Sequence, residues 1–269
     1  MIGGHEARVI GSHAKVAASV ELQYRSNFWI YLVNALVTLG LSLSSIALVY
    51  RHVDQVGGWS SDDLLVVVGV FFALGAIVNG VVHSSMSKLV ADIRHGDFDY
   101  RLLKPVDAQL VALAQQPEPW RVLDLVVGAL VVAVGIGRGG FEQFGAGGLA
   151  GALAAAGVMF LCSVTIVASF WALLASMTFW TVQGEGILWA LDDMYDHLRW
   201  PITIFPDGLR LALSTIFPAG LAVTVPALAL TGRLDATAAA SAVAMAAGLA
   251  AAARLVWRVA VRRYEGASA

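Results

Sequence analysis

The stretch from residue 62 to residue 86, DDLLVVVGVFFALGAIVNGVVHSSM, decides the fold class of this chain. Between Asp63 and His83 it contains no ionisable side chain, and about 20 apolar residues are enough for a helix to cross the hydrocarbon layer of a membrane. Five further stretches have the same character, at about 27–50, 119–137, 153–180, 207–230 and 236–258. The sequence therefore predicts an all-α, polytopic membrane protein with six transmembrane helices and short interfacial helices between them.

The composition of the whole chain agrees with this class. Of its 269 residues, 58% are hydrophobic and only 13% are charged, whereas soluble domains carry about 25% charged residues. The formal net charge of −2 gives no indication of a nucleic-acid partner. The single cysteine, Cys162, lies in an apolar run, so the sequence predicts neither a disulfide framework nor a metal site. The preference for Arg over Lys, with abundant Ala, Val and Gly, points to a GC-rich bacterial genome and a bacterial plasma membrane.

The distribution of Lys and Arg predicts the orientation, because cytoplasmic loops carry an excess of positive side chains. With a cytoplasmic N-terminus, the outer loops hold only Arg51, Arg138 and Arg233. The inner segments then hold Arg8, Lys15, Arg25, Lys88, Arg94, Arg101, Lys104, Arg121, Arg199, Arg254, Arg258, Arg262 and Arg263. Both termini are therefore predicted to be cytoplasmic. An N-terminal segment at 1–26 precedes the six-span domain at 27–258, whose largest cytoplasmic loop is 88–119, and a tail follows at 259–269.

The loop at 88–119 contains a charged stretch, IRHGDFDYRLLKP, at 93–105. Its apolar side chains are predicted to share one helical face with charges around it: Phe98, Leu102, Leu103, Val106 and Leu110. Pro105 permits a new helix start, and Asp107 is placed to cap a second short helix. One interpretation is a surface helix that only connects two spans. The other is a docking element for a cytoplasmic protein, because a pure lipid anchor would favour basic residues over this mixture of charges.

Polar side chains follow the first two spans at helical spacing. They are Asn34, Thr38, Ser42 and Ser45 in the first span, and Gly75, Asn79, His83 and Ser87 in the second. Hydrogen bonds between helices, worth roughly 0.6–2 kcal/mol each, explain such stripes. The alternative is that the stripes line a translocation path. His83 is interpreted as a structural histidine, with a pH sensor as the alternative.

Two features lie in and before the predicted fifth span. Pro218 and Pro226 remove backbone donors, which predicts either a static bend or a helix that moves to open a pathway. The preceding segment at 185–201 reads EGILWALDDMYDHLRWP and is interpreted as a second interfacial helix on the cytoplasmic side. Three carboxylates on its polar side form a candidate second contact for a partner: Asp192, Asp193 and Asp196.

Three motifs together resemble the small six-span permease subunits of type-2 ABC exporters, and more narrowly the viologen-exporter permeases. They are GGWS before the second span, IRHGDFDYRLLKPVD after it, and RWPITIFPDGLRLALSTIFPAGLAVTVPALAL around the fifth. Their order and spacing match the family from about residue 20 to residue 260. Arg101 departs from the family pattern, which has an apolar residue at this point.

The resemblance implies a permease subunit that exports a small amphipathic or hydrophobic substrate by alternating access. No G-x-x-x-x-G-K-[ST] loop occurs in the sequence, so no cofactor is expected on this chain; ATP and Mg²⁺ would bind a partner ATP-binding cassette ATPase, present in two copies. A second permease chain, identical or paralogous, is also implied. The resemblance assigns the ATPase-coupling region to Asp97, Phe98, Asp99, Arg101, Leu102, Leu103, Lys104 and Pro105. Candidates for the path are Asn34, Thr38, Asn79, His83, Phe217 and Pro218.

Two other function classes remain as alternatives. Asp192 to Asp196, DDMYD, match the D-D-x-x-D pattern with which membrane prenyltransferases hold Mg²⁺ against a diphosphate. A stand-alone secondary transporter would need an ion-coupling carboxylate inside a span, and none of the spans shows a clear one. The sequence contains neither a G-x-S-x-G nor an H-E-x-x-H motif, which argues against a hydrolase.

Overall fold

A computed structural model describes residues 11–12, 15–16, 19, 25–103, 106–140, 144, 148–181, 186, 188–190, 195, 200–215 and 217–264. Over these residues the chain is nearly all helical, and the one isolated bridge joins Val56 to Trp59. Among the same residues, five helices are long and apolar enough to cross a membrane, and a sharply bent pair would make a sixth. The prediction of an all-α polytopic membrane protein is confirmed.

The five long spans contain α2 (Arg25–Tyr50), α3 (Ser61–Ile77), α7 (Val122–Gly139), α8 (Gly148–Ser176) and α12 (Ala236–Arg262). The second span is longer than a bilayer requires, because α3 continues through the π-helix η1 (Val78–His83) into α4 (Ser84–His95), 35 residues in all. Single 3-10 turns precede α7 and follow α8: η2 (Pro119–Arg121) and η4 (Met177–Phe179).

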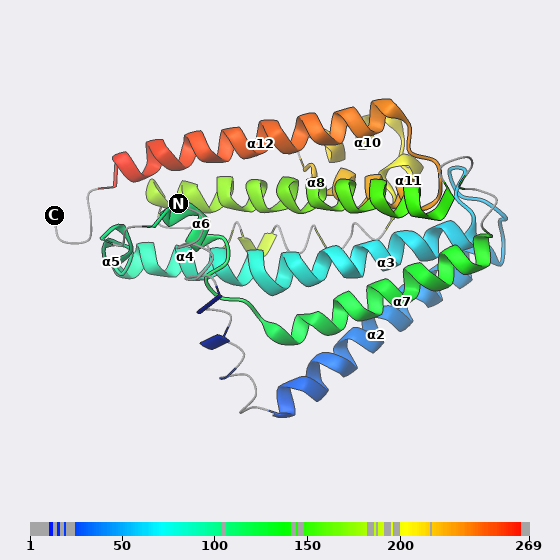
Figure 1. Ribbon diagram of the computed structural model, residues 1–269, viewed down its shortest axis with the longest axis horizontal. Coiled ribbons are helices and arrows are strands. Elements are labelled where there is room, and N and C mark those ends of the chain that lie inside the picture. Colours follow the sequence, from blue (N-terminus) through cyan, green and yellow to red (C-terminus); the bar gives the residue numbers. More distant parts are fainter. Residues whose placement is uncertain are drawn as a thin grey trace.

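Figure 1 shows how the spans are arranged. The helices α3, α8 and α12 run side by side, and α7 packs against α3 on the side away from α12. The helix α2 diverges from the bundle toward its N-terminal end. The turns that follow α2, α7 and α11 (Ala219–Leu230) lie at one end, on the right of the view, which is the predicted outer end. The short helices α5 (Asp99–Leu102) and α6 (Ala108–Ala112) lie at the opposite end with the last turn of α12.

Glycines allow α3 and α7 to pack with their backbones almost in contact. A Cβ atom at Gly128 would lie 2.6 Å from the carbonyl oxygen of Gly69, and a Cβ at Gly69 would lie 2.7 Å from the carbonyl oxygen of Gly128. Such close approach is how helices gain dispersion energy in lipid, where the hydrophobic effect does not drive them together. This pair of glycines therefore holds the third span against the second.

We expect Gly128→Ala to separate α3 from α7, because the new methyl group meets backbone rather than a movable side chain. The loss of stability should be about 1–3 kcal/mol, the usual range for overpacking. Thermal unfolding in mild detergent measures it. Gly137→Ala on the same helix is the matched control, because nothing lies within 4 Å of its Cβ position; equal unfolding temperatures for the two variants would contradict the packing argument.

The outer turn at Gly57–Ser60 joins several segments through Trp59, which is 1% exposed. The indole Nε1 donates to Thr203 Oγ1 at 2.8 Å, and the guanidinium of Arg233 lies 4.8 Å from the centre of the indole ring. Tyr50 donates its hydroxyl to the carbonyl of Trp59 at 2.6 Å. Ser60 then begins α3 with a capping box that pairs its side chain with the Asp63 amide.

The predicted fifth span at 207–230 is not one continuous crossing. The helix α10 (Asp207–Thr215) and the following helix α11 differ in direction by 103°, with Pro218 at the N-cap of α11. The 12 residues of α11 extend about 18 Å, well short of a hydrocarbon layer about 30 Å thick. The break at Pro218 is thus larger than the predicted kink, while Pro226 lies inside α11.

Both ends of this bent pair lie at the outer end of the molecule. Before α10, Ile204 of the turn η5 (Ile202–Ile204) lies against Gly57, where an added Cβ would meet Ile204 Cγ2 at 3.0 Å. After α11, Arg233 donates to the carbonyl of Gly58 at 2.8 Å. Because the two glycines are adjacent in one outer turn, α10 and α11 form a re-entrant pair that begins and ends on the same side.

The segment before η5 also differs from its predicted position at the cytoplasmic surface. Among its described residues, Trp189 contacts the ring of His83, and Tyr195 donates to the carbonyl of Phe71 at 3.3 Å. Thr203 then reaches Trp59 at the outer end, so these residues follow the second span from its inner part outward. The prediction was wrong because Leu188 and Tyr195, each 1% exposed, are buried against the bundle. Three acidic residues suggested a surface location, but Asp192, Asp193 and Asp196 lie outside the described residues.

Candidate functional site: a central cavity and the cytoplasmic loop

Parts of the polar stripes of the first two spans line one cavity of about 520 Å³, whereas Ser42 and Ser45 donate to carbonyls of their own helix. Four of the predicted path residues line it: Asn34 and Thr38 from α2, and Asn79 and His83 from η1. Phe71, Phe72 and Gly75 of α3 form an apolar wall beside them. The structure therefore brings together residues that lie on different helices and more than forty positions apart in the sequence.

Aromatic side chains that sequence reasoning missed complete the wall of the cavity. Tyr195 stacks on Phe71 with ring centres 5.3 Å apart, and Trp189 approaches the ring of His83 at 6.2 Å. Both aromatic residues come from the segment that was predicted to lie on the cytoplasmic surface, so local sequence carried no signal for this role. Tyr31, which also lines the cavity, was detectable because it lies one helical turn before Asn34 on the same stripe.

Phe217 and Pro218, the other two predicted path residues, lie outside this lining. Phe217 is 3% exposed and contacts the ring of Trp171 at 6.2 Å. Trp171 in turn contacts Tyr195 at 6.4 Å, so an aromatic chain connects the break between α10 and α11 to the cavity wall. Phe217 therefore belongs to the support of the wall.

A charged group lies at the inner mouth of the cavity, at the start of the third span. Arg121 lies between two carboxylates, with its Nε 3.3 Å from Glu118 Oε2 and its Nη1 3.4 Å from Asp124 Oδ2. Tyr31 donates to Glu118 at 3.4 Å and also lies under the guanidinium at 5.4 Å. The spacing of three residues between successive charges could have predicted these contacts from the sequence, because side chains three apart on a helix are neighbours.

The π-helix η1 joins the cavity to the loop at 88–119, which is predicted to be cytoplasmic and is called the cytoplasmic loop below. It contributes Asn79 and His83 to the lining, and the carbonyl of Gly80 accepts a hydrogen bond from the Glu118 amide at 2.7 Å. A Cβ at Gly80 would lie 2.7 Å from Arg121 Cβ, so the third span begins directly against η1. Single π turns inside α-helices are frequent at functional sites because they redirect side chains and free backbone groups.

The cytoplasmic loop is closed at its base by hydrogen bonds between its two ends. Ser84 Oγ donates to the Gln116 carbonyl at 2.6 Å, and Gln115 donates to the Ser85 carbonyl at 2.8 Å. The amide of Gln116 also donates to Ser85 Oγ at 3.1 Å. The residues between these anchors therefore start and finish at the same point on the second span.

The tip of the loop is attached to the bundle by one buried ring. Phe98 is fully buried, and its ring packs against Phe179, Trp257 and Tyr264, with ring centres 5.1, 6.0 and 5.5 Å away. These three partners come from η4, from the end of α12 and from the residues that follow it. The loop is therefore packed against η4 and the C-terminal end of α12.

Three ion pairs, made by two aspartates, strengthen this attachment. The carboxylate of Asp92, 2% exposed, pairs with Lys88 at 2.8 Å and with Arg101. Asp107 caps α6 and pairs with Arg254 of α12, whose Nη1 lies 3.0 Å from Asp107 Oδ1. Burial alone would raise the pKa of Asp107, but hydrogen bonds from Arg254 and from backbone amides outweigh it and lower the pKa below its ordinary value.

The predicted coupling residues divide into two groups. Phe98 and Arg101 face the bundle, whereas Asp97, Leu102 and Leu103 are exposed. The prediction that Phe98 and the leucines share one face is wrong, because the ring contacts of Phe98 turn it away from them. Asp99 is half-buried, and Lys104 and Pro105 lie outside the described residues.

Arg101 now has a physical explanation. Arg101 pairs with the buried carboxylate of Asp92, which also pairs with Lys88. A buried carboxylate without a partner would be strongly destabilising. Tyr100, at 72% exposed, was missed by the sequence analysis but belongs to the exposed surface with Leu103, at 81%.

A family match covers most of the chain. The model of the family described as ABC-2 family transporter protein matches residues 36–268. The chain belongs to this family. No curated protein and no solved structure matches it. ABC-2 membrane proteins are transport permeases rather than enzymes, and they generally work with an ATP-binding cassette ATPase.

Membership in the ABC-2 family sets aside the prenyltransferase. Within the described part of this ABC-2 permease, no three His, Cys, Asp or Glu side chains gather closely enough to hold a metal ion. The aspartates of the D-D-x-x-D pattern lie outside that part. Five spans and a bent pair make the permease a multi-pass membrane protein.

We expect Asp107→Asn to loosen the loop from α12 at neutral pH, because the ion pair with Arg254 is lost. Since the folded-state pKa of Asp107 lies below its unfolded value, the native ion pair contributes stability above that value and loses it as the pH falls. Thermal unfolding should show a difference of about 0.2–1 kcal/mol at pH 6 that shrinks below about pH 4. A difference that grows with acidity would contradict this assignment.

Proposed function

We propose that this chain is the permease subunit of an ATP-driven exporter in a bacterial plasma membrane, and that the cavity between α2, α3 and η1 is its substrate path. The observation that carries the proposal is the direct connection of this cavity, through η1, to a cytoplasmic loop with exposed Tyr100, Leu102 and Leu103. The narrower likeness to viologen-exporter permeases supports export over import.

The cavity supports a small amphipathic substrate. Its lining combines the rings of Phe71, Phe72 and Tyr195 with the side-chain amides of Asn34 and Asn79. Ligand sites of this mixed kind bind apolar bodies by burial and fix their orientation with a few polar groups. The two outer turns that the structure describes throughout, at 51–60 and 231–235, are too short to form an additional binding domain.

In the proposed mechanism, two ATPase subunits bind two permease chains, identical or paralogous, on the exposed loop surface. ATP and Mg²⁺ bind the ATPase subunits. When ATP closes the ATPase pair, the loop moves as a closed unit because its ends are hydrogen-bonded at Ser84 and Gln116. The movement passes through η1 to the cavity wall, which then opens outward in an alternating-access cycle.

The ATPase contact is tested by the double variant Tyr100→Ala, Leu103→Ala. Both side chains are exposed and make no contribution to the buried cluster around Phe98, so the permease should fold normally. We expect loss of the ATPase subunit in a detergent pull-down and loss of ATP-dependent transport. Leu211→Ala is the matched control, since Leu211 is 63% exposed on α10 at the other end of the molecule. Recovery of the ATPase with the double variant would overturn this contact.

The path is tested by Asn79→Leu, which keeps the approximate size of the side chain and removes its polar atoms. We expect reduced uptake of an amphipathic rhodamine dye into inverted vesicles, with the ATPase subunit still bound, because Asn79 lies in the cavity and away from the loop surface. Val243→Asn on the exposed face of α12 controls for general effects on insertion. Unchanged transport of every dye that the wild type transports would contradict a path through this cavity.

A further inference from the structure

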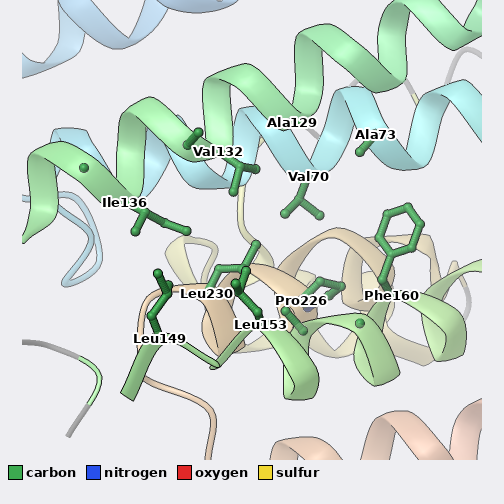
Figure 2. Close-up of a pocket in the computed structure, with 14 residues that line it drawn as sticks. Val70, Ala73, Ala129, Val132, Ile136, Leu149, Leu153, Phe160, Pro226 and Leu230 are labelled. Carbon is green, nitrogen blue, oxygen red and sulfur yellow. The ribbon is translucent and has the colours of Figure 1, made fainter. Parts of the chain in front are cut away.

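A second cavity, of about 560 Å³, lies between α3 and α7 on one side and α8 and α11 on the other. Figure 2 shows Val132 and Ile136 of α7 pointing toward Leu230 of α11 and Leu153 of α8 across the space. All of its lining residues are aliphatic side chains, glycine, proline or phenylalanine. It is separate from the substrate path, with which it shares no lining residue.

The cavity extends from the predicted outer end of the bundle toward the middle of the spans. Ile136 lies near the end of α7, Leu149 near the start of α8, and Leu230 at the end of α11, and all three of these ends belong to the outer side. The surrounding surface faces lipid, since Val134 of α7 and Val158 of α8 are more than half exposed. The cavity is therefore a cleft beside the acyl chains of the outer leaflet.

The chemistry of the cleft identifies its occupant. Water needs two or more polar partners in a buried site, and this lining offers no polar side chain. A flexible hydrocarbon chain is narrow, apolar and already present at this depth.

We propose that one acyl chain of a membrane phospholipid binds in this cleft and completes the packing between α7, α8 and the re-entrant helix α11. This inference is independent of the substrate path and of the ATPase contact. Because Pro226 and Leu230 of α11 line the cleft, the bound chain adds to the packing of α8 and α3 against the re-entrant pair. Its removal should destabilise the outer half of the bundle.

Two lining glycines allow the cleft to be filled by substitution. Nothing lies within 4 Å of a Cβ built at Gly137 of α7 or at Gly157 of α8, so leucine side chains can enter without moving the backbone. The test variant is Gly137→Leu with Gly157→Leu. Gly151→Leu is the matched control, because its Cβ position on α8 is equally open but Gly151 does not line the cleft.

The experiment is native mass spectrometry of the full chain, with any co-purifying subunits, after reconstitution with phosphatidylethanolamine and release in detergent. We expect the wild type and Gly151→Leu to retain one phospholipid after loosely bound lipid has been stripped, and the filled variant to lose it. Delipidation should lower the unfolding temperature of the first two proteins and leave that of the filled variant unchanged. If the double variant does not fold, Gly157→Leu alone is measured in the same way.

Two results would overturn the proposal. One is equal lipid retention by the wild type and the filled variant. The other is a disulfide-linked dimer formed in membranes by Gly157→Cys in a Cys162→Ser background, which would show that a second copy covers the cleft. Absence of that dimer together with loss of lipid from the filled variant supports an acyl chain as the occupant.

Discussion

The indole of Trp59 makes the contact on which the outer half of this permease depends. It donates to Thr203 just before the re-entrant pair and lies under Arg233 just after it. A single buried ring therefore fixes both ends of a 103° bend to the first turn of α3. The short helix α11, which cannot cross the hydrocarbon layer alone, is held by this contact at its ends and by packing against α8 and α3 along its length.

The inner half is organised around the second span, which changes character along its length. As α3 it is an apolar, glycine-packed helix against α7, and as α4 it is an amphipathic helix that carries the loop. The change occurs at η1, where the backbone leaves α-helical bonding and the third span begins against Gly80. Aromatic contacts at Phe98 and the ion pair at Arg254 then tie the loop to α8 and α12. One continuous helix thereby connects the lipid-embedded cavity with the cytoplasmic surface.

The sequence predicted those features that depend on local composition. Apolar length located the five long spans, and Asp107 was recognised as a helix cap before its contact with Arg254 was visible. The re-entrant pair was missed because hydropathy measures only how apolar a segment is. It contains no information on whether the segment crosses the membrane or turns back to the side from which it entered. Arg101 was assigned outward because its partner, Asp92, is nine residues away and its burial depends on the tertiary packing of α4. The sequence revealed each polar stripe separately. It did not reveal the shared cavity, because that cavity depends on how α2 packs beside η1 in the folded protein.

The closed base of the cytoplasmic loop makes it a transferable module. Because Ser84, Ser85, Gln115 and Gln116 bond one another, the residues between them can be exchanged with those of another permease without changing the distance between the second and third spans. The exchange has a requirement beyond the loop itself. The surfaces that receive Phe98 and Asp107 lie on α12, so Trp257 and Arg254 must be exchanged with them. Diversification of partner choice in such a protein would therefore proceed by joint changes in two stretches of sequence more than a hundred residues apart.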